Sequence, residues 1–134
     1  MRSLVLDANT IIQYFDDSHK GHLAAVQAIG RTKHPLLVND LTLAEVLVGA
    51  FREDRPSERL DDIKNKIGAT IVGETGEEWA MYLAELRARV VPRLKVPDAV
   101  VLATALRVDG LVCTFDTALR EAARNEGVLY VPTK

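Results

Sequence analysis

Leu4-Val5-Leu6-Asp7 is a short apolar run that ends in a carboxylate, and the same pattern returns near the other end as Leu111-Val112-Cys113-Thr114-Phe115-Asp116. Continuous apolar runs of this length are typical of strands buried on both faces of a parallel sheet. Similar runs occupy 36–38, 69–72 and 128–131. We therefore expect about five strands in a mostly parallel central sheet.

Segments with helical patterns separate these strands. Apolar residues at helical spacing predict helices over 9–15, 22–31, 41–51, 56–67, 77–91, 98–108 and 117–126. Gly68 and Pro92 are expected to end two of them, and Pro97 opens the one that follows. Strands that alternate with helices indicate an α/β fold with three α/β/α layers, whose ligands bind at the carboxyl ends of the strands.

Composition limits the possible classes. A chain of 134 residues with 48% hydrophobic content suits a single domain covering 1–134. The first six residues hold no signal-peptide pattern, so we expect a soluble, cytoplasmic protein with no membrane segment. The lone Cys113 fits a reducing compartment or a protein indifferent to redox conditions, and its apolar surroundings predict a place in the core. A formal net charge of −2 gives no global attraction to nucleic acid, so any polyanion must be bound by a local cluster.

Four acidic residues are the candidate chemical groups. Asp7 and Asp116 follow strands, whereas Glu45 and Asp98 lie near helix starts. Each also has a purely structural interpretation. Asp7 and Asp116 suit helix N-caps, Glu45 follows Thr42 at the spacing of a capping box, and Asp98 suits the first turn of a helix.

Taken together, the four positions favour a metal site. In a parallel sheet, the carboxyl ends of strands and the starts of the following helices share one edge. Carboxylates gathered there raise one another's pKa unless a cation neutralises them. Because no His or Cys cluster accompanies them, Mg2+ or Mn2+ is favoured over zinc.

The ordered set of these stretches resembles the PIN-domain ribonucleases, and within them the VapC-like toxins of toxin-antitoxin pairs. The resemblance spans essentially the whole chain and lies in four stretches: Leu4 to Asn9, Leu41 to Leu47, Val96 to Ala99 and Leu111 to Asp116. It implies a catalytic and metal-binding site of Asp7, Glu45, Asp98 and Asp116, supported by Thr114 and Asn9. Many relatives carry a further acid where this chain has Thr117-Ala118-Leu119, so a second metal position lacks that ligand.

The same resemblance implies an activity and partners. We expect a Mg2+- or Mn2+-dependent endoribonuclease that cuts single-stranded or loop regions of RNA and leaves a 5′-phosphate and a 3′-hydroxyl. The expected partners are RNA, a cognate VapB-like antitoxin and a second copy of the chain. Apolar residues in the helices at 41–51 and 77–91 exceed what a small sheet can cover, which agrees with a homodimer.

One basic stretch is a candidate for holding RNA. Arg87, Arg89, Arg93 and Lys95 occur without an intervening acid just before Asp98. Their alternative role is structural, since basic residues are favoured at the C-terminus of a helix.

Two other functions remain as alternatives. The first is a catalytically silent PIN-like module that binds RNA or protein, because a fold does not establish an activity. The second is a phosphoryl-transfer or receiver-like domain with Asp7 as the phosphorylated group. A phosphatase of this kind needs a second acid where the chain has Asn9, which counts against that alternative.

Overall fold

A computed structural model describes residues 2–132. Its centre is a four-stranded sheet in the order β3-β2-β1-β4, made of β1 (Leu4–Leu6), β2 (Leu36–Asn39), β3 (Ala69–Val72) and β4 (Leu111–Cys113). All neighbouring strands are parallel. This confirms the expected α/β fold with a parallel sheet.

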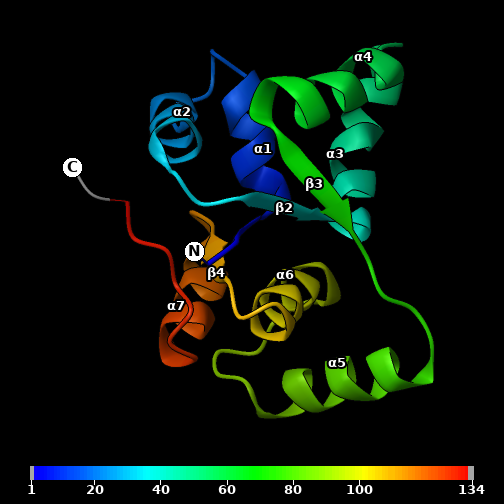
Figure 1. Ribbon diagram of the computed structural model, residues 1–134, viewed down its shortest axis with the longest axis vertical. Coiled ribbons are helices and arrows are strands. Elements are labelled where there is room, and N and C mark those ends of the chain that lie inside the picture. The colour runs from blue at the N-terminus through cyan, green and yellow to red at the C-terminus, as the bar shows by residue number, and fades with distance from the viewer. Residues whose placement is uncertain (1, 133–134) are drawn as a thin grey trace.

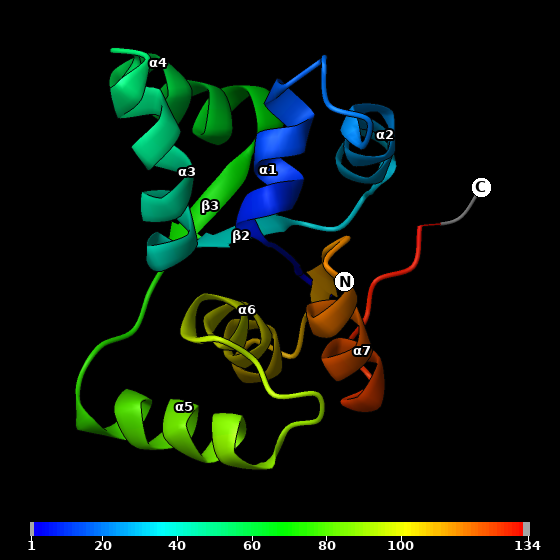
Figure 2. The same cartoon turned by 180° about the vertical axis from the view of Figure 1, so that it is seen from behind.

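Helices cover the sheet on both sides (Figures 1 and 2). One layer holds α1 (Ala8–Phe15), α2 (His22–Arg31), α3 (Asp40–Arg52), α4 (Pro56–Asp61) and a π-helical stretch η1 (Asp62–Ile67). The other holds α5 (Glu77–Arg89), α6 (Val96–Arg107) and α7 (Thr117–Asn125). The three-layer arrangement agrees with the expectation from sequence.

The alternation of side chains along β1 explains why both faces need a cover. Leu4 and Leu6 point into the core formed with α1, α2 and α3, whereas Val5 belongs to the core formed with α5, α6 and α7. All three are fully buried. Successive strand residues point to opposite faces, so an unbroken apolar run requires helices on both sides.

Two elements differ from the sequence prediction. The expected strand at 128–131 is reduced to a single parallel bridge between Val112 and Leu129, so the sheet has four strands rather than five. The expected helix over 56–67 changes to π-helical geometry at Asp62 and ends at Gly68, whose φ of 81° suits glycine.

No helix within residues 2–132 combines the length and apolar character that a membrane span requires.

Candidate functional site

Strand pairing brings Asp7 and Thr114 together. Leu6 pairs with Cys113 in the β1–β4 register, so the next residue of each strand lies at the same carboxyl edge. There the Thr114 hydroxyl donates a hydrogen bond to Asp7 Oδ2 and accepts one from the Asp116 backbone N–H at 3.0 Å. A hydroxyl has only one proton to donate. Because the Thr114 oxygen accepts the Asp116 N–H, its own proton is free to be donated to Asp7.

Asp7 also caps α1. Its Oδ1 accepts hydrogen bonds from the backbone N–H and hydroxyl of Thr10, at 2.8 and 2.7 Å. A carboxylate has about four acceptor directions, and three are used by Thr10 and Thr114, which leaves roughly one on Oδ2 for another partner. The residue is buried, so these contacts fix one orientation of its carboxylate.

The other two aspartates occupy helix starts. Asp116 caps α7 by accepting the Leu119 N–H at 2.9 Å, and Asp98 lies in the first turn of α6, whose N-cap is Lys95. The structural roles inferred for Asp7, Asp98 and Asp116 are therefore confirmed. Those roles also place all three carboxylates at helix N-termini, where the helix dipole favours negative charge.

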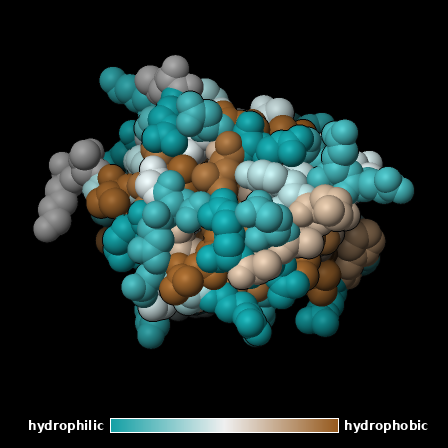
Figure 3. Space-filling view, turned by 90° about the horizontal axis from the view of Figure 1, so that it is seen from below, coloured by the Kyte–Doolittle hydropathy of each residue, from teal (hydrophilic) through white to brown (hydrophobic). Residues whose placement is uncertain are grey.

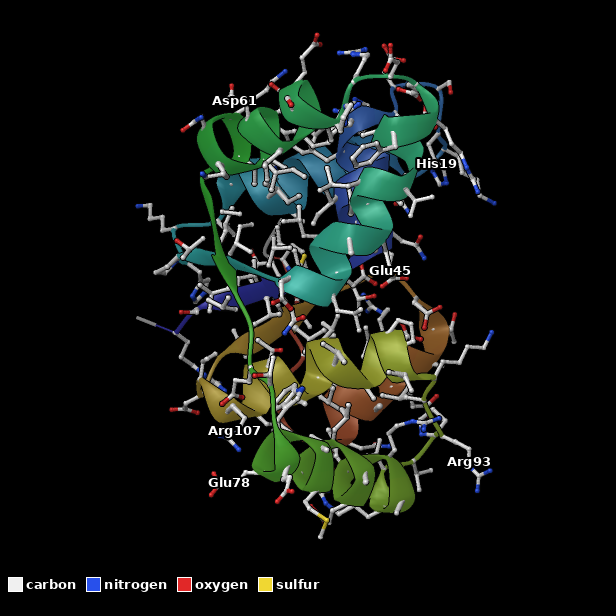
Figure 4. All side chains as sticks on the ribbon, turned by 90° about the vertical axis from the view of Figure 1, so that its right-hand side faces the viewer. His19, Glu45, Asp61, Glu78, Arg93 and Arg107 are labelled. Atoms are coloured by element: carbon white, nitrogen blue, oxygen red, sulfur yellow. The ribbon has the colours of Figure 1, made fainter. Side chains whose placement is uncertain are left out.

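The capping-box interpretation of Glu45 is wrong. The α3 helix begins at Asp40, and its N-cap is Asn39, which accepts the Leu41 N–H at 2.8 Å. Glu45 therefore lies in the second turn and caps nothing. Figure 4 shows its side chain at the level where the two helical layers meet.

The four carboxylates influence one another electrostatically. The pKa of Asp98 is raised from 3.8 to about 6, first by burial and then by the negative charges of Asp116, Asp7 and Glu45. Burial, with a smaller contribution from Asp116, raises the pKa of Asp7 against the lowering effect of its hydrogen bonds. Burial and Asp7 raise the pKa of Glu45. Such mutual shifts occur at functional sites.

The donor set suits a hard divalent ion, since it consists of carboxylate oxygens and one threonine hydroxyl. Within residues 2–132, however, no three acidic, histidine or cysteine side chains already have metal-binding geometry. The residues fit the ion by chemistry, and its binding requires side-chain adjustment.

The two residues expected to support the acids, Thr114 and Asn9, lie in different surroundings. Thr114 contacts Asp7, but Asn9 is exposed and makes no side-chain hydrogen bond within the described residues. Thr10, one residue later, is buried and contacts Asp7 instead. Its position three residues after a helix-capping Asp is the signal that could have identified it. Leu119 is fully buried and contributes only its backbone N–H.

The basic stretch separates into two pairs. Arg89 forms ion pairs with Glu85 and Glu126, each at 2.9 Å, and Arg87 donates to the Leu94 carbonyl at 3.1 Å. Arg93 and Lys95 are exposed and form no side-chain hydrogen bond or ion pair within residues 2–132. Arg93 extends from the loop between α5 and α6 toward solvent, on the same side of the view as Glu45 (Figure 4).

The structure is that of an α/β domain with a parallel sheet, in which the charges of Asp7, Glu45 and Asp116 all act on Asp98. The particular family follows from a family model: the model described as the PIN domain matches residues 4–125, and the chain belongs to this family. A comparison with curated proteins found no match.

Solved structures of toxin-antitoxin proteins share the fold. A toxin-antitoxin complex from Klebsiella pneumoniae matches with 23% identity and a TM-score of 0.74, covering 98% of this chain and 99% of the other. VapC20 of Mycobacterium tuberculosis, described as a sarcin-ricin loop cleaving toxin, matches with 13% identity and a TM-score of 0.77, covering 98% and 100%. VapBC2 of Rickettsia felis, bound to a promoter DNA fragment, matches with 13% identity and a TM-score of 0.65, covering 89% and 92%.

Proposed function

We propose that the protein is a metal-dependent endoribonuclease, and that Asp7, Glu45, Asp98 and Asp116 form its active site. The observation that carries the proposal is the raised pKa of Asp98, because its causes include the charges of all three other acids. Four carboxylates from four different elements come within electrostatic reach at the edge where α/β folds bind ligands. Membership of the PIN domain family supports the same function.

Asp7, Asp98, Asp116 and Glu45 are the residues that would hold Mg2+ or Mn2+. When bound, such an ion lowers the pKa of a water molecule and neutralises charge on the scissile phosphate. The chain's own contributions are orientation and charge. Thr10 and Thr114 fix the Asp7 carboxylate. Glu45 is exposed on α3, and its proposed role is to orient the attacking water.

The proposed substrate is RNA in single-stranded or loop regions, cut to leave a 5′-phosphate and a 3′-hydroxyl. Asp7 is buried, but Glu45 is exposed and Asp98 and Asp116 are partly exposed. An unstacked strand can bend to bring its phosphate to these accessible carboxylates. Arg93 and Lys95 are the proposed phosphate contacts, because Arg87 and Arg89 already have partners. The match to a sarcin-ricin loop cleaving toxin agrees with a loop substrate.

The proposed cellular role is that of the toxin of a toxin-antitoxin pair, with a VapB-like antitoxin as partner. Two of the similar structures are toxin-antitoxin complexes. A pocket of about 360 Å³ between α1, α3 and α4 is a proposed binding place for a segment of the partner. Ile12, Phe15 and Val46 line it, and its rim carries charges of both signs from Asp16, Glu53, Arg55 and Arg59. We expect this pair to act in the cytoplasm, as a homodimer of the toxin.

The test is cleavage of end-labelled RNA by the purified protein and by Asp98→Asn, with Mg2+, with Mn2+ and with a chelator. The proposal predicts metal-dependent cleavage by the parent protein and at least a hundredfold loss in the variant. Equal cleavage by both proteins would assign the activity to a contaminant and reject the site.

A catalytically silent RNA- or protein-binding module is the second candidate, because a fold does not by itself establish an activity. It predicts RNA binding that neither metal nor Asp98→Asn alters. A filter-binding measurement on the same samples distinguishes the two functions.

A further inference from the structure

Two pockets adjoin beside the chain segment that follows α7. The first, of about 480 Å³, lies against α2, and the second, also of about 480 Å³, continues along the residues before β2 and the start of β4. Arg31 and Tyr130 line both pockets. Volumes of about 300–1,000 Å³ are common for pockets that hold ligands. We call this surface the Tyr130 groove and define it by Arg31, Lys33, His34, Phe115 and Tyr130.

The charged side chains of the groove are all basic. Arg31 and Lys33 line it, and none of the residues within 2–132 that line it is an aspartate or a glutamate. A third pocket, which shares His34 with the groove, adds Lys66 and again no described acid. By contrast, the pocket between α1, α3 and α4 and the pocket beside Arg107 each carry charges of both signs. Since Asp and Glu outnumber Lys and Arg by 19 to 17 in the chain, the groove is a local concentration of positive charge.

The two basic side chains are available to a ligand. Both are exposed, and neither forms a side-chain hydrogen bond or an ion pair within residues 2–132. Arg2, at the same edge of the sheet, differs, because it forms an ion pair with Asp109 at 3.6 Å and donates to two backbone carbonyls. The helix dipole accounts for Arg31, which lies in the last turn of α2. Lys33 lies beyond the end of that helix, so the dipole does not account for it.

Tyr130 supplies an aromatic ring beside these charges. The residue is half-buried, and its ring meets the His34 ring edge to face, with centroids 5.7 Å apart and planes at 82°. His34 Nδ1 lies 2.6 Å from the Arg2 carbonyl oxygen, and the Tyr130 N–H donates to the Val112 carbonyl at 2.9 Å. These contacts hold both residues in place, which lowers the entropy cost of binding a ligand. Aromatic rings beside basic side chains recur in sites for single-stranded nucleic acid, where bases stack on the rings and the basic groups follow the phosphates.

The groove leads toward the acidic site. Phe115, which lines it, directly precedes Asp116. The other end lies at the amino edge of the sheet, where His34 precedes β2 and Leu111 begins β4. In Figure 1 the chain beyond α7 (red) runs past β4 on the side of α2. A strand lying in the groove therefore follows the β4 side of the sheet from its amino edge to the neighbourhood of the acids.

We propose that the Tyr130 groove is a second RNA-binding site, in which Arg31 and Lys33 contact phosphates and Tyr130 stacks on a base. This inference rests on the proposed function, which makes single-stranded RNA the substrate. The groove holds nucleotides that flank the cut. An acidic peptide matches the charge of the groove equally well, but it offers no base to the Tyr130 ring.

The experiment measures the binding of fluorescein-labelled oligouridine, about 16 nucleotides long, by fluorescence anisotropy at several salt concentrations. The protein carries Asp98→Asn so that the RNA is not cut. We expect the double change Arg31→Gln and Lys33→Gln to raise the dissociation constant about tenfold. It should also reduce the slope of log affinity against log salt by about 1.4, or about 0.7 for each lost phosphate contact. The double change Lys20→Gln and Arg52→Gln is the matched control, since it removes the same charge from exposed residues outside the groove and should alter neither quantity.

Tyr130→Leu and Tyr130→Phe test the stacking. Leucine removes the ring and keeps an apolar side chain, whereas phenylalanine keeps the ring. We expect Tyr130→Leu to raise the dissociation constant at least about fivefold with an unchanged salt slope, and Tyr130→Phe to stay within about twofold of the Asp98→Asn protein. Thermal unfolding shows whether each variant is folded. If Tyr130→Leu is not, the changes at Arg31 and Lys33 decide the question, because these side chains are exposed.

Two results would overturn the inference. If the Arg31 and Lys33 variant binds RNA as the Lys20 and Arg52 control does, the groove is not an RNA site, and metal-dependent cleavage by the parent protein would leave the proposed function standing. If Tyr130→Leu binds normally and oligoglutamate of the same length displaces the RNA as well as unlabelled oligouridine does, the groove binds acidic peptides instead. Absence of cleavage by the parent, with RNA binding that still depends on Arg31 and Lys33, would reject the nuclease and retain the groove.

Discussion

At the scale of single residues, Asp98 links the acidic site to stability. Its pKa in the folded protein is about 6, against 3.8 for an ordinary aspartate, so the folded state binds the proton more tightly than the unfolded state. Between these two values the unfolded state loses its proton first. The stabilisation that protonation gives is therefore full below pH 3.8 and is lost as the pH rises through about 6.

Replacing Asp98 by Asn should remove the loss of stability that the folded protein undergoes when Asp98 becomes charged. In metal-free protein above pH 6, we expect Asp98→Asn to raise the unfolding temperature by about 3 °C, which corresponds to roughly 1 kcal/mol after allowance for solvent screening of a half-buried group. The difference should shrink as the pH falls toward 4. Thermal unfolding across this pH range in a chelating buffer measures it, and a constant difference at every pH would contradict the pKa assigned to Asp98.

Cys113 gives a second prediction at this scale. Burial at the end of β4, with the nearby charge of Asp7, raises the pKa of its thiol to about 12. The thiolate is the reactive form, so at neutral pH we expect less than about 1% of the native protein to react with iodoacetamide during an incubation that modifies the unfolded chain fully. Mass spectrometry of native and guanidinium-unfolded samples checks this. Rapid labelling of the native protein would show that β4 opens readily.

At the scale of elements, the loop between α5 and α6 is the proposed RNA contact. Charge reversal at Arg93 and Lys95 should weaken RNA binding and reduce the slope of log affinity against log salt by about 0.7 per lost phosphate contact. Binding is measured in an Asp98→Asn background so that RNA is not cut. Arg89→Gln is the matched control: its ion pairs with Glu85 and Glu126 predict lower stability but an unchanged salt slope. A slope that falls for Arg89→Gln and not for Arg93→Glu would reverse the assignment.

The elements also show what the sequence could predict and why. The apolar run at β1 predicted burial on both faces, and Leu4, Val5 and Leu6 are fully buried between two helical layers. Such periodicity is a local property that follows from the pleat of a strand. The contact of Thr114 with Asp7 is different in kind, because it joins residues 107 positions apart and depends on the β1–β4 register.

Two predictions were wrong: the capping box at Thr42 and Glu45, and the strand at 128–131. Thr42 and Glu45 have capping-box spacing, yet Asn39 caps the helix three residues earlier and moves both into its interior. The segment at 128–131 has strand-like composition, but only Leu129 forms a bridge with β4. The residue that caps a helix and the length of an edge strand depend on the three-dimensional contacts of the backbone. The pattern of apolar residues does not predict these contacts.

At the scale of the whole molecule, exposed apolar side chains agree with the proposed homodimer. On α3, Leu41, Val48 and Phe51 are exposed, and Phe51 retains 68% of its accessible surface. On α5, Met81 retains 74%. Figure 3, which views the molecule from the α5 side, shows apolar residues among the polar surface. Because α3 and α5 lie in opposite helical layers (Figure 1), these side chains belong to two separate apolar regions, and exposed apolar regions commonly mark an interface.

Phe51→Glu tests this arrangement. A charge in an apolar interface must lose its hydration, so we expect the variant to be monomeric at concentrations where the parent is a dimer, with dissociation at least a hundredfold easier. Light scattering after size-exclusion chromatography measures the mass. Leu23→Glu, a comparable change on α2, should leave the dimer intact. A parent protein that is monomeric throughout would reject the homodimer.

The central claim is that four carboxylates act as one metal-dependent unit on RNA. The most direct measurement is the single-turnover rate of RNA cleavage at saturating Mn2+ for Asp7→Asn, Asp98→Asn and the double variant. If the residues act as a unit, each single change should reduce the rate by at least a hundredfold, and the double change should add little more. Near-parental rates in either single variant, or losses that simply multiply in the double variant, would contradict the account.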